Sequence, residues 1–192
     1  MAEYLTLEDV KKKKSRYRRQ FGALPLRMSD DGRIEVMLVT SRETRRWIVP
    51  KGWPIKGLTG AQTAAREAQE EAGVIGVTGK HPVGAYMYDK RLKNGDSTRC
   101  YVELYPLWVV DDLPRWPEHE QREVEWLSVE AAAERAGDES LGDLLRAVHN
   151  NGLPRSSHKL YRKARRVHED RDGVLDKAPK KCKQSTEPTQ SA

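Results

Sequence analysis

The chain has 192 residues, of which 37% are hydrophobic and 33% are charged, and its formal net charge at pH 7 is +6. This length suits one domain with an appendage, because a single core usually takes about 100 to 200 residues. No apolar run approaches the roughly 20 residues that cross a bilayer, and no secretory signal is apparent, so we expect a cytoplasmic protein with no membrane partner and two reduced cysteines.

The first part of the chain has the pattern of a basic lead-in followed by a β-hairpin. Lysines and arginines crowd residues 1–19. Apolar runs over 21–27 and 34–40 flank a polar cluster with a glycine, which is typical of two paired strands and their turn. A short apolar piece at 47–50 runs into the loop 51–60, whose three glycines and one proline predict irregular structure.

A helix and a second hairpin are expected next. Strong helix formers fill residues 61–72, and Gly73 follows where a left-handed cap residue is favoured. Aromatic and β-branched residues over 83–90 and 98–110 predict two strands joined by a short polar turn.

The domain is expected to end with one strand and two helices. The strand covers 122–129, and Ser128 is placed to cap a helix over 129–136. A further helix is predicted over 139–149.

The excess positive charge lies after this domain. Residues 1–149 hold 24 Lys and Arg against 24 Asp and Glu, whereas residues 150–192 hold 11 against 5. Nucleic acid, a membrane surface or an acidic partner could bind such a tail, although a solvated end is the simpler explanation. We therefore divide the chain into a basic lead-in (1–19), a folded domain (20–149) and a basic, partly disordered tail that includes one basic helix.

Three glutamates share one turn of the predicted helix over 61–72. At 100° per residue, Glu67, Glu70 and Glu71 project from one side, within about 6 Å of one another. A solvated face is one explanation, helped by an i,i+4 pair of Arg66 with Glu70 that contributes about 0.3 kcal/mol. The other explanation is a divalent cation, because carboxylate oxygens on a rigid turn suit Mg²⁺ or Mn²⁺, which would remove the mutual repulsion.

The residues around this turn resemble a known motif. Gly52 is followed after thirteen residues by REAQEEAGV at 66–74, which resembles the Nudix box, GX₅EX₇REUXEEXGU with U an aliphatic residue. Two positions depart from it: Leu58 stands at the first glutamate and Ala68 at the first aliphatic residue. The resemblance implies an α/β fold, namely an α/β/α sandwich with a mixed central sheet, that holds a divalent metal and hydrolyses a diphosphate linkage.

The resemblance also implies roles for the residues of the box. Glu67, Glu70 and Glu71 would be the metal ligands, with Mg²⁺ as the expected cofactor and Mn²⁺ as the alternative. Glu67 is a candidate to orient or deprotonate the attacking water. Arg66 would hold the carboxylates, and Gly52 would let the backbone turn beneath them. The candidate bases outside the box are Glu118, Glu120 and Glu123.

Blocks of sequence over 17–147 are similar to the diphosphoinositol polyphosphate phosphohydrolases within the Nudix superfamily, which also split diadenosine polyphosphates and inorganic polyphosphate. This similarity implies a small-molecule polyphosphate substrate. The planar fork of arginine suits such anions, although solvation also explains arginines in loops and at strand edges. The implied substrate-binding residues are Arg18, Arg19, Ser41, Arg42, Lys51, Arg99 and Arg122.

The expected activity is hydrolysis of a phosphoanhydride bond by attack of water at phosphorus. One alternative is an RNA 5′-pyrophosphohydrolase or a nucleotide-sugar hydrolase, whose substrates offer a base that can stack on an aromatic ring. The other is a non-catalytic nucleic-acid or regulatory module that uses the basic tail, although pure binding of an anion gains nothing from three adjacent carboxylates. The sequence leaves the physiological substrate and the oligomeric state open.

Overall fold

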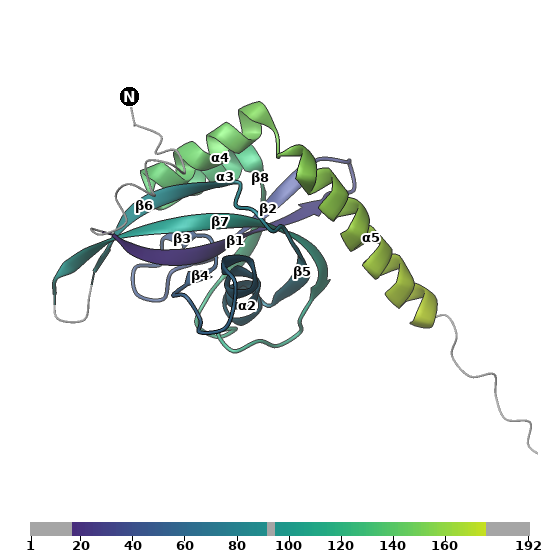
Figure 1. Cartoon of the computed structure of the whole chain (residues 1–192), viewed down its shortest axis with the longest axis horizontal. Coiled ribbons are helices and arrows are strands. Elements are labelled where there is room, and N and C mark those ends of the chain that lie inside the picture. Colours follow the sequence, from purple (N-terminus) through teal and green to yellow (C-terminus); the bar gives the residue numbers. More distant parts are fainter. Residues whose placement is uncertain (1–16, 92–94, 176–192) are drawn as a thin grey trace, which may run out of the picture.

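One mixed β-sheet organises the fold. The computed structural model describes residues 17–91 and 95–175 (Figure 1). The strands in this part of the chain are β1 (Arg18–Met28), β2 (Ile34–Thr40), β3 (Trp47–Ile48), β4 (Lys51–Gly52), β5 (Val74–Thr78), β6 (Gly84–Arg91), β7 (Ser97–Asp112) and β8 (Val124–Ser128). The helices are α2 (Gly60–Ala72), α3 (Val129–Arg135), α4 (Glu139–Asn151) and α5 (Arg155–Leu175).

The sheet is mixed because β1 pairs with both parallel and antiparallel strands. It runs parallel to β7 but antiparallel to β2 and β4. The path across the sheet is β3-β2-β1-β7-β5, with β6 paired to β7 and β8 paired to β2. A parallel pair at the centre of a sheet needs apolar cover on both faces.

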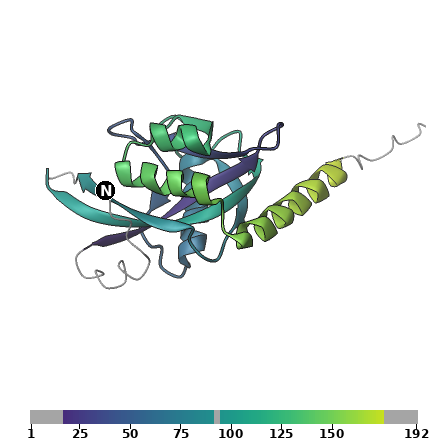
Figure 2. The ribbon, with the colours of Figure 1, turned by 90° about the horizontal axis from the view of Figure 1, so that it is seen from above.

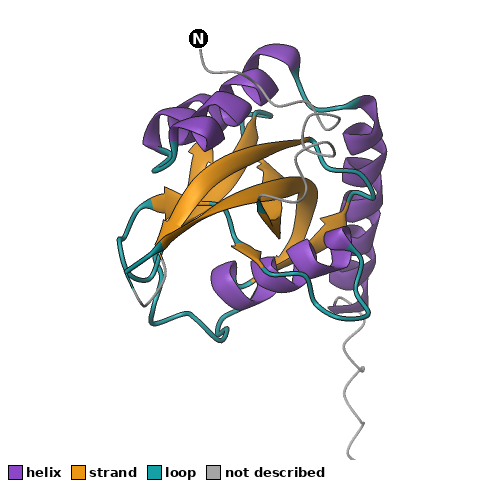
Figure 3. Ribbon diagram, turned by 60° about the vertical axis from the view of Figure 1, so that its left-hand side comes forward, coloured by secondary structure: helices purple, strands orange, loops and turns teal. Residues whose placement is uncertain are grey.

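Helices provide this cover on the two faces of the sheet (Figures 1 and 3). On one face, α2 packs through Ala64 and Ala68, which are fully buried. On the other face, α3 and α4 pack through Ala132, Leu141 and Leu145. This arrangement confirms the expected α/β/α sandwich. None of the helices within residues 17–91 and 95–175 is long and apolar enough to span a membrane.

The predicted hairpins and helices are confirmed, while two predictions for the middle of the chain are incomplete. Gly73 ends α2 in the left-handed conformation, with φ 69°. The loop 51–60 is not wholly irregular, because Lys51 and Gly52 form β4 by pairing with β1. A two-residue strand that depends on a distant partner leaves no periodic pattern. The pattern also does not predict β5, which follows Gly73 directly without a turn of its own.

The first part of the predicted tail forms α5, which packs on the domain. The Trp108 indole Nε1 donates a hydrogen bond to the Ser157 carbonyl oxygen at 3.0 Å, and the Trp108 and Tyr161 ring centroids are 4.8 Å apart. Ala164 is buried on the same side of α5. Figure 2 shows the rest of this helix extending away from the sheet. The division of the chain at residue 149 stays a prediction, and the first part of the tail contacts the domain through Trp108.

One of the two cysteines lies in the described part of the chain. Cys100 is buried and forms no disulfide. Cys182, residues 1–16 and residues 176–192 lie outside the described part of the chain, so the predictions about them stay untested.

Candidate active site

Helix α2 is fixed at both ends and on its alanine side, which determines where its glutamates point. Thr59 and Gln62 form a capping box, in which the Gln62 N–H donates to the Thr59 Oγ1 at 3.3 Å and the Thr59 N–H donates to the Gln62 Oε1 at 2.9 Å. Because Ala64 and Ala68 lie against the sheet, the acidic side of the helix faces β4 and the loop after β7.

Glu67 lies against the backbone of Gly52. A Cβ atom at position 52 would collide with the Glu67 carboxylate, so any other residue there would displace this side chain. Among the described residues, no hydrogen bond or ion pair to this carboxylate is found. Burial raises the pKa of Glu67 to about 7. Repulsion by neighbouring carboxylates adds to this shift, in the order Glu71, Glu70 and Glu118.

Glu71 is the buried member of the cluster and is held by Arg122. The Arg122 Nη2 donates to the Glu71 Oε1, and the two side chains are only 5% and 10% exposed. Arg122 also donates to the Thr40 carbonyl oxygen at 2.9 Å and to the Glu118 Oε2 at 2.5 Å. The Lys51 backbone N–H donates to the Glu71 Oε2 at 3.0 Å. Since breaking such a buried pair costs about 3 to 5 kcal/mol, Arg122 is needed to keep Glu71 in place.

Glu70 is partly exposed and has an ion-pair partner on its own helix. It pairs with Arg66 at i,i+4, and its side chain is 35% exposed. This pair matches the one that the sequence predicts. Arg66 therefore contacts the acidic turn, while its role in catalysis stays a prediction.

Of the three candidate bases outside the box, Glu118 is the one that the fold brings to this turn. Its backbone N–H donates to the Glu70 carbonyl oxygen at 3.2 Å, which ties the loop after β7 to α2. Glu123 instead pairs at the surface with Arg45, and Glu120 is exposed. Glu67 and Glu118 are therefore the candidates that geometry favours for positioning water.

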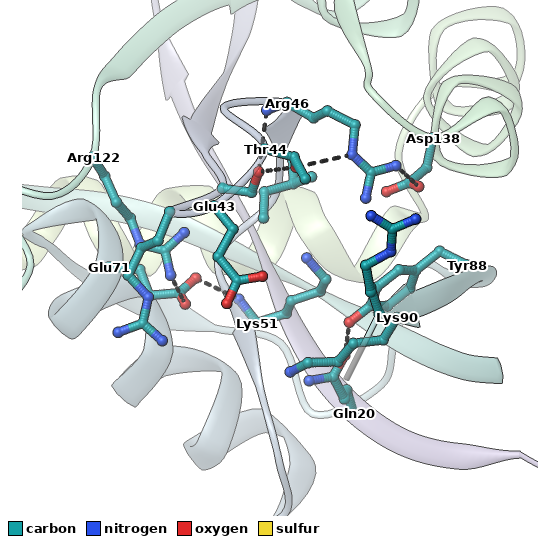
Figure 4. Close-up of a pocket in the computed structure, with 14 residues that line it drawn as sticks. Gln20, Glu43, Thr44, Arg46, Lys51, Glu71, Tyr88, Lys90, Arg122 and Asp138 are labelled. Atoms are coloured by element: carbon teal, nitrogen blue, oxygen red, sulfur yellow. Dashed lines mark hydrogen bonds and ion pairs between the residues drawn. The ribbon is translucent and has the colours of Figure 1, made fainter. Parts of the chain in front are cut away.

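A pocket of about 320 Å³ opens beside Glu71 (Figure 4). Six cationic side chains line it, and three of them are paired. Arg46 pairs with Asp138 at 3.0 Å, Arg42 pairs with Glu118 at 3.1 Å, and Arg122 pairs with Glu71. Within the described part of the chain, the other three form no ion pair, and the exposed Glu43 is the anion without a partner at the rim. These three unpaired cations are Lys51, Lys90 and Arg91.

Lys51 forms part of the pocket wall and is buried, with 9% of its surface exposed. Its Nζ lies 4.9 Å from the centroid of the Tyr88 ring. Burial lowers the pKa of Lys51 to about 8, an effect that the carboxylates of Glu71 and Asp138 oppose. Lys51 therefore remains mainly charged at pH 7.

The predicted substrate-binding residues divide into two groups. The Arg18 guanidinium stacks on Trp53, 4.2 Å from a ring centroid, near the pocket residue Lys90. Arg19 pairs with Glu103 at 2.7 Å, and Arg99 pairs at the surface with Asp89 at 3.0 Å. Neither arginine lines the pocket. Those that do line it are Ser41, Arg42, Lys51 and Arg122, whose contact with substrate stays a prediction.

Sequence reasoning missed several residues that line the pocket. Lys90 and Arg91 end β6 and are adjacent basic residues beside a turn, which is a signal that could have indicated a phosphate contact. No such signal marks the other residues: Gln20 lies in β1, Tyr88 lies in β6, and Asp138 precedes α4. They reach the pocket only because β1, β6 and the start of α4 meet there.

Comparison with known proteins identifies the family of this site. The family profile described as NUDIX domain matches residues 16–148. The chain belongs to the Nudix family. Its relatives include Nudix hydrolase 16, mitochondrial, of Arabidopsis thaliana, which is 34% identical over 110 residues, or 55% of this chain and 61% of that protein. Nudix hydrolase 13, mitochondrial, of the same plant is 26% identical over 167 residues, or 77% of this chain and 83% of that protein.

A solved structure supports the same assignment. The crystal structure of a C. elegans Ap4A hydrolase binary complex matches with a TM-score of 0.53 and 27% identity, covering 69% of this chain and 96% of that chain. Membership of the Nudix family places this chain among the pyrophosphohydrolase enzymes. Nudix enzymes generally use divalent metal cations.

The donor set of the acidic turn fits such a cation. Glu67 offers a carboxylate with no hydrogen bond or ion pair among the described residues, cradled by Gly52. Within residues 17–91 and 95–175, however, no three Asp, Glu, His or Cys side chains are arranged as a metal site. In this structure Arg66 pairs with Glu70 and Arg122 pairs with Glu71. Metal coordination would require one of these carboxylates to share or exchange its arginine partner.

The raised pKa of Glu67 predicts a pH-dependent effect of its removal in the metal-free protein. The folded-state pKa, about 7, lies above that of an unfolded glutamate, so the native protein loses stability as the pH rises through 7. Glu67→Gln removes this ionisation. In EDTA, we expect Glu67→Gln to raise the melting temperature relative to the native protein more at pH 8 than at pH 5.

Thermal unfolding followed by circular dichroism measures this difference. Glu134→Gln, which alters an exposed carboxylate on α3, is the matched control. An equal effect of Glu67→Gln at the two pH values would show that this carboxylate is not held in a charge-repelling environment.

Proposed function

We propose that the protein hydrolyses a phosphoanhydride bond in a highly phosphorylated small molecule, such as a diphosphoinositol polyphosphate or a diadenosine polyphosphate, with Mg²⁺ as the cofactor and Mn²⁺ as the alternative. The observation that carries this proposal is the separation of charge in one site. Glu71 of the acidic turn of α2 lines the pocket, and the unpaired cations Lys51, Lys90 and Arg91 line the same pocket. A polyphosphate needs both, because its reacting end requires a metal and its other phosphates require cationic donors.

The roles of the protein side chains follow from their contacts. Glu67, Glu70 and Glu71 would hold the cation, which would supply a bound water of lowered pKa and neutralise charge on the phosphates. Arg122 keeps Glu71 in position. Glu118 lies beside the same turn and could accept a proton from the water or orient it.

The identity of the substrate is supported from two directions. The similarity of sequence blocks to diphosphoinositol polyphosphate phosphohydrolases favours an inositol pyrophosphate, whereas the name of the C. elegans neighbour points to diadenosine tetraphosphate. Chromatographic separation of the hydrolysis products of inositol pyrophosphates, dinucleoside polyphosphates, capped RNA and nucleotide sugars, each with Mg²⁺ or Mn²⁺, ranks these classes directly. The cytoplasmic location also stays a prediction.

Loss of one carboxylate from the turn should remove most of the activity. Glu70→Gln keeps the size of the side chain but removes a hard anionic ligand, so we expect turnover at saturating substrate to fall by about 10² or more. EDTA should abolish phosphate release, and Mg²⁺ should restore it. Because Glu70 is partly exposed, the melting temperature of this variant should stay close to that of the native protein. Near-normal turnover of the folded variant would refute the assignment of the metal ligands.

A nucleic-acid partner is the second candidate, and the outer face of α5 favours it. At 100° per residue, its exposed cations fall on the side opposite the contact with Trp108. In the part of the chain that the structure describes, these cations form no ion pair. They are Arg155, Lys159, Arg162, Lys163 and Arg166.

Substitution of this face tests the alternative better than deletion of the helix, which would expose Trp108. If α5 binds RNA, changing Arg162, Lys163 and Arg166 together to Gln should weaken binding of single-stranded RNA about 10-fold at low salt and reduce its salt dependence. Hydrolysis of small substrates should not change. Fluorescence anisotropy with labelled RNA measures the effect, and equal binding by the variant and the native protein would exclude this surface.

A further inference from the structure

The loop that joins β7 to β8, residues 113–123, is attached to the end of α2 by backbone hydrogen bonds. The Leu113 N–H donates to the Gly73 carbonyl oxygen at 2.7 Å. The Glu118 N–H donates to the Glu70 carbonyl oxygen at 3.2 Å. Carbonyl groups at the end of a helix have no partner within the helix, so they are available to a neighbouring segment. The loop therefore runs along the acidic turn of α2.

Trp116 lies between these two attachments in the sequence and packs on Gly73. A Cβ atom at position 73 would collide with the ring atoms Cδ2 and Cε3 of Trp116, so the ring occupies the space that a side chain would need. Gly73 also has φ 69°, which glycine adopts without strain. The glycine that ends α2 therefore has two roles, because it caps the helix and leaves room for Trp116.

Packing, and not hydrogen bonding, holds the Trp116 ring. Its indole Nε1 is buried, and no acceptor for this N–H is found within residues 17–91 and 95–175. A buried donor without an acceptor costs free energy, so the ring stays in place because of its other contacts. The His119 ring is edge-on to it, with centroids 4.3 Å apart and an angle of 86° between the ring planes. Another aromatic ring, without a donor, should therefore fill this position adequately.

The far end of the loop is held by a second loop, residues 41–46 between β2 and β3. The Arg45 Nη1 donates to the Gln121 carbonyl oxygen at 2.9 Å, and Arg45 pairs with Glu123. Arg45 itself has a positive φ of 55°, which costs free energy in a residue other than glycine and persists only where contacts hold it. Glu118 thus lies between two attachments, one at α2 and one at this second loop.

These attachments determine where the Glu118 carboxylate lies. It accepts hydrogen bonds from Arg42 at 3.1 Å and from Arg122 at 2.5 Å, and its charge helps to raise the pKa of Glu67. Arg122 lines the pocket, whereas Trp116 and Glu118 do not. Displacement of Glu118 should therefore affect the chemical step more than the binding of phosphate groups.

We propose that Trp116 is a positioning residue for catalysis. By packing on Gly73, its ring holds Glu118 beside the acidic turn, where Glu118 orients the attacking water or accepts its proton. Trp116 acts through Glu118 and contacts neither the water nor the substrate. The inference rests on the proposed function for its kinetic test, but the position of the loop can be measured without turnover.

Trp116→Ala removes the ring and leaves the backbone of the loop unchanged. The substrate is diadenosine tetraphosphate or a diphosphoinositol polyphosphate, whichever the native protein hydrolyses faster with Mg²⁺. We expect kcat to fall about 10-fold or more while KM stays within about twofold, because the loss is in the chemical step. Trp116→Phe keeps an aromatic ring and should retain kcat within about twofold of the native value. Trp116→Leu gives the same comparison if Trp116→Ala does not fold.

Trp126→Ala is the matched control. It removes another half-buried tryptophan, on β8, whose ring is covered by Arg27. This variant should lower the melting temperature without changing kcat. A merely structural role of Trp116 would give the same result for Trp116→Ala, namely a lower melting temperature and a native kcat below the unfolding transition, and would overturn the proposal.

A double-mutant cycle decides whether Trp116 acts through Glu118. Glu118→Gln alone should lower kcat by about 10². Because the carboxylate is already displaced when the ring is absent, the variant with both Trp116→Ala and Glu118→Gln should be about as slow as Glu118→Gln alone. Two effects that multiply, or a Trp116→Phe variant as slow as Trp116→Ala, would contradict the inference.

Hydrogen exchange of the Glu118 amide makes the test independent of turnover. Because this amide donates to Glu70, its exchange rate reports whether the loop stays on α2. In EDTA, the rate should rise about 10-fold in Trp116→Ala and stay at the native value in Trp116→Phe and Trp126→Ala. If the native protein hydrolyses neither substrate but shows this pattern, the proposed function fails while the positioning of Glu118 by Trp116 holds. An unchanged rate in Trp116→Ala would overturn the inference.

Discussion

The buried contact between Arg122 and Glu71 is the interaction on which the site depends. Four carboxylates, those of Glu67, Glu70, Glu71 and Glu118, lie around one helical turn, where like charges repel. Arg122 counters this repulsion, because its guanidinium binds the carboxylates of Glu71 and Glu118 and a backbone carbonyl oxygen of β2 at the same time. The pair joins α2, the loop after β7 and the sheet into one unit.

The same contact separates charge across the pocket. Since Arg122 neutralises Glu71 from one side, the cations of β4 and β6 are not needed for this purpose and stay without ion-pair partners among the described residues. Burial disfavours the charged form of Lys51 and lowers its pKa. A site in which the Glu67 carboxylate and the cations Lys51, Lys90 and Arg91 lack ion-pair partners among the described residues is unfavourable for stability alone. It becomes favourable when a cation and a polyanion bind together.

Local patterns predicted the parts of this structure that depend on neighbours in the sequence. The helix with its glutamates, the cap at Gly73 and the two hairpins follow from periodicity and from turn residues. The partner of Glu71 does not, because Arg122 is 51 residues away and only the fold brings it close. The contribution of Lys90 to the pocket and the packing of α5 on Trp108 likewise depend on tertiary contacts that no periodic pattern encodes.

Paramagnetic broadening by Mn²⁺ tests the central claim most directly. The carboxyl carbon signals of ¹³C-labelled glutamates can be assigned by single substitutions and followed while Mn²⁺ is added to the protein. The account predicts that the signals of Glu67, Glu70 and Glu71 broaden first, at substoichiometric Mn²⁺. Uniform broadening of all glutamate signals, or first broadening of glutamates away from α2, would contradict it.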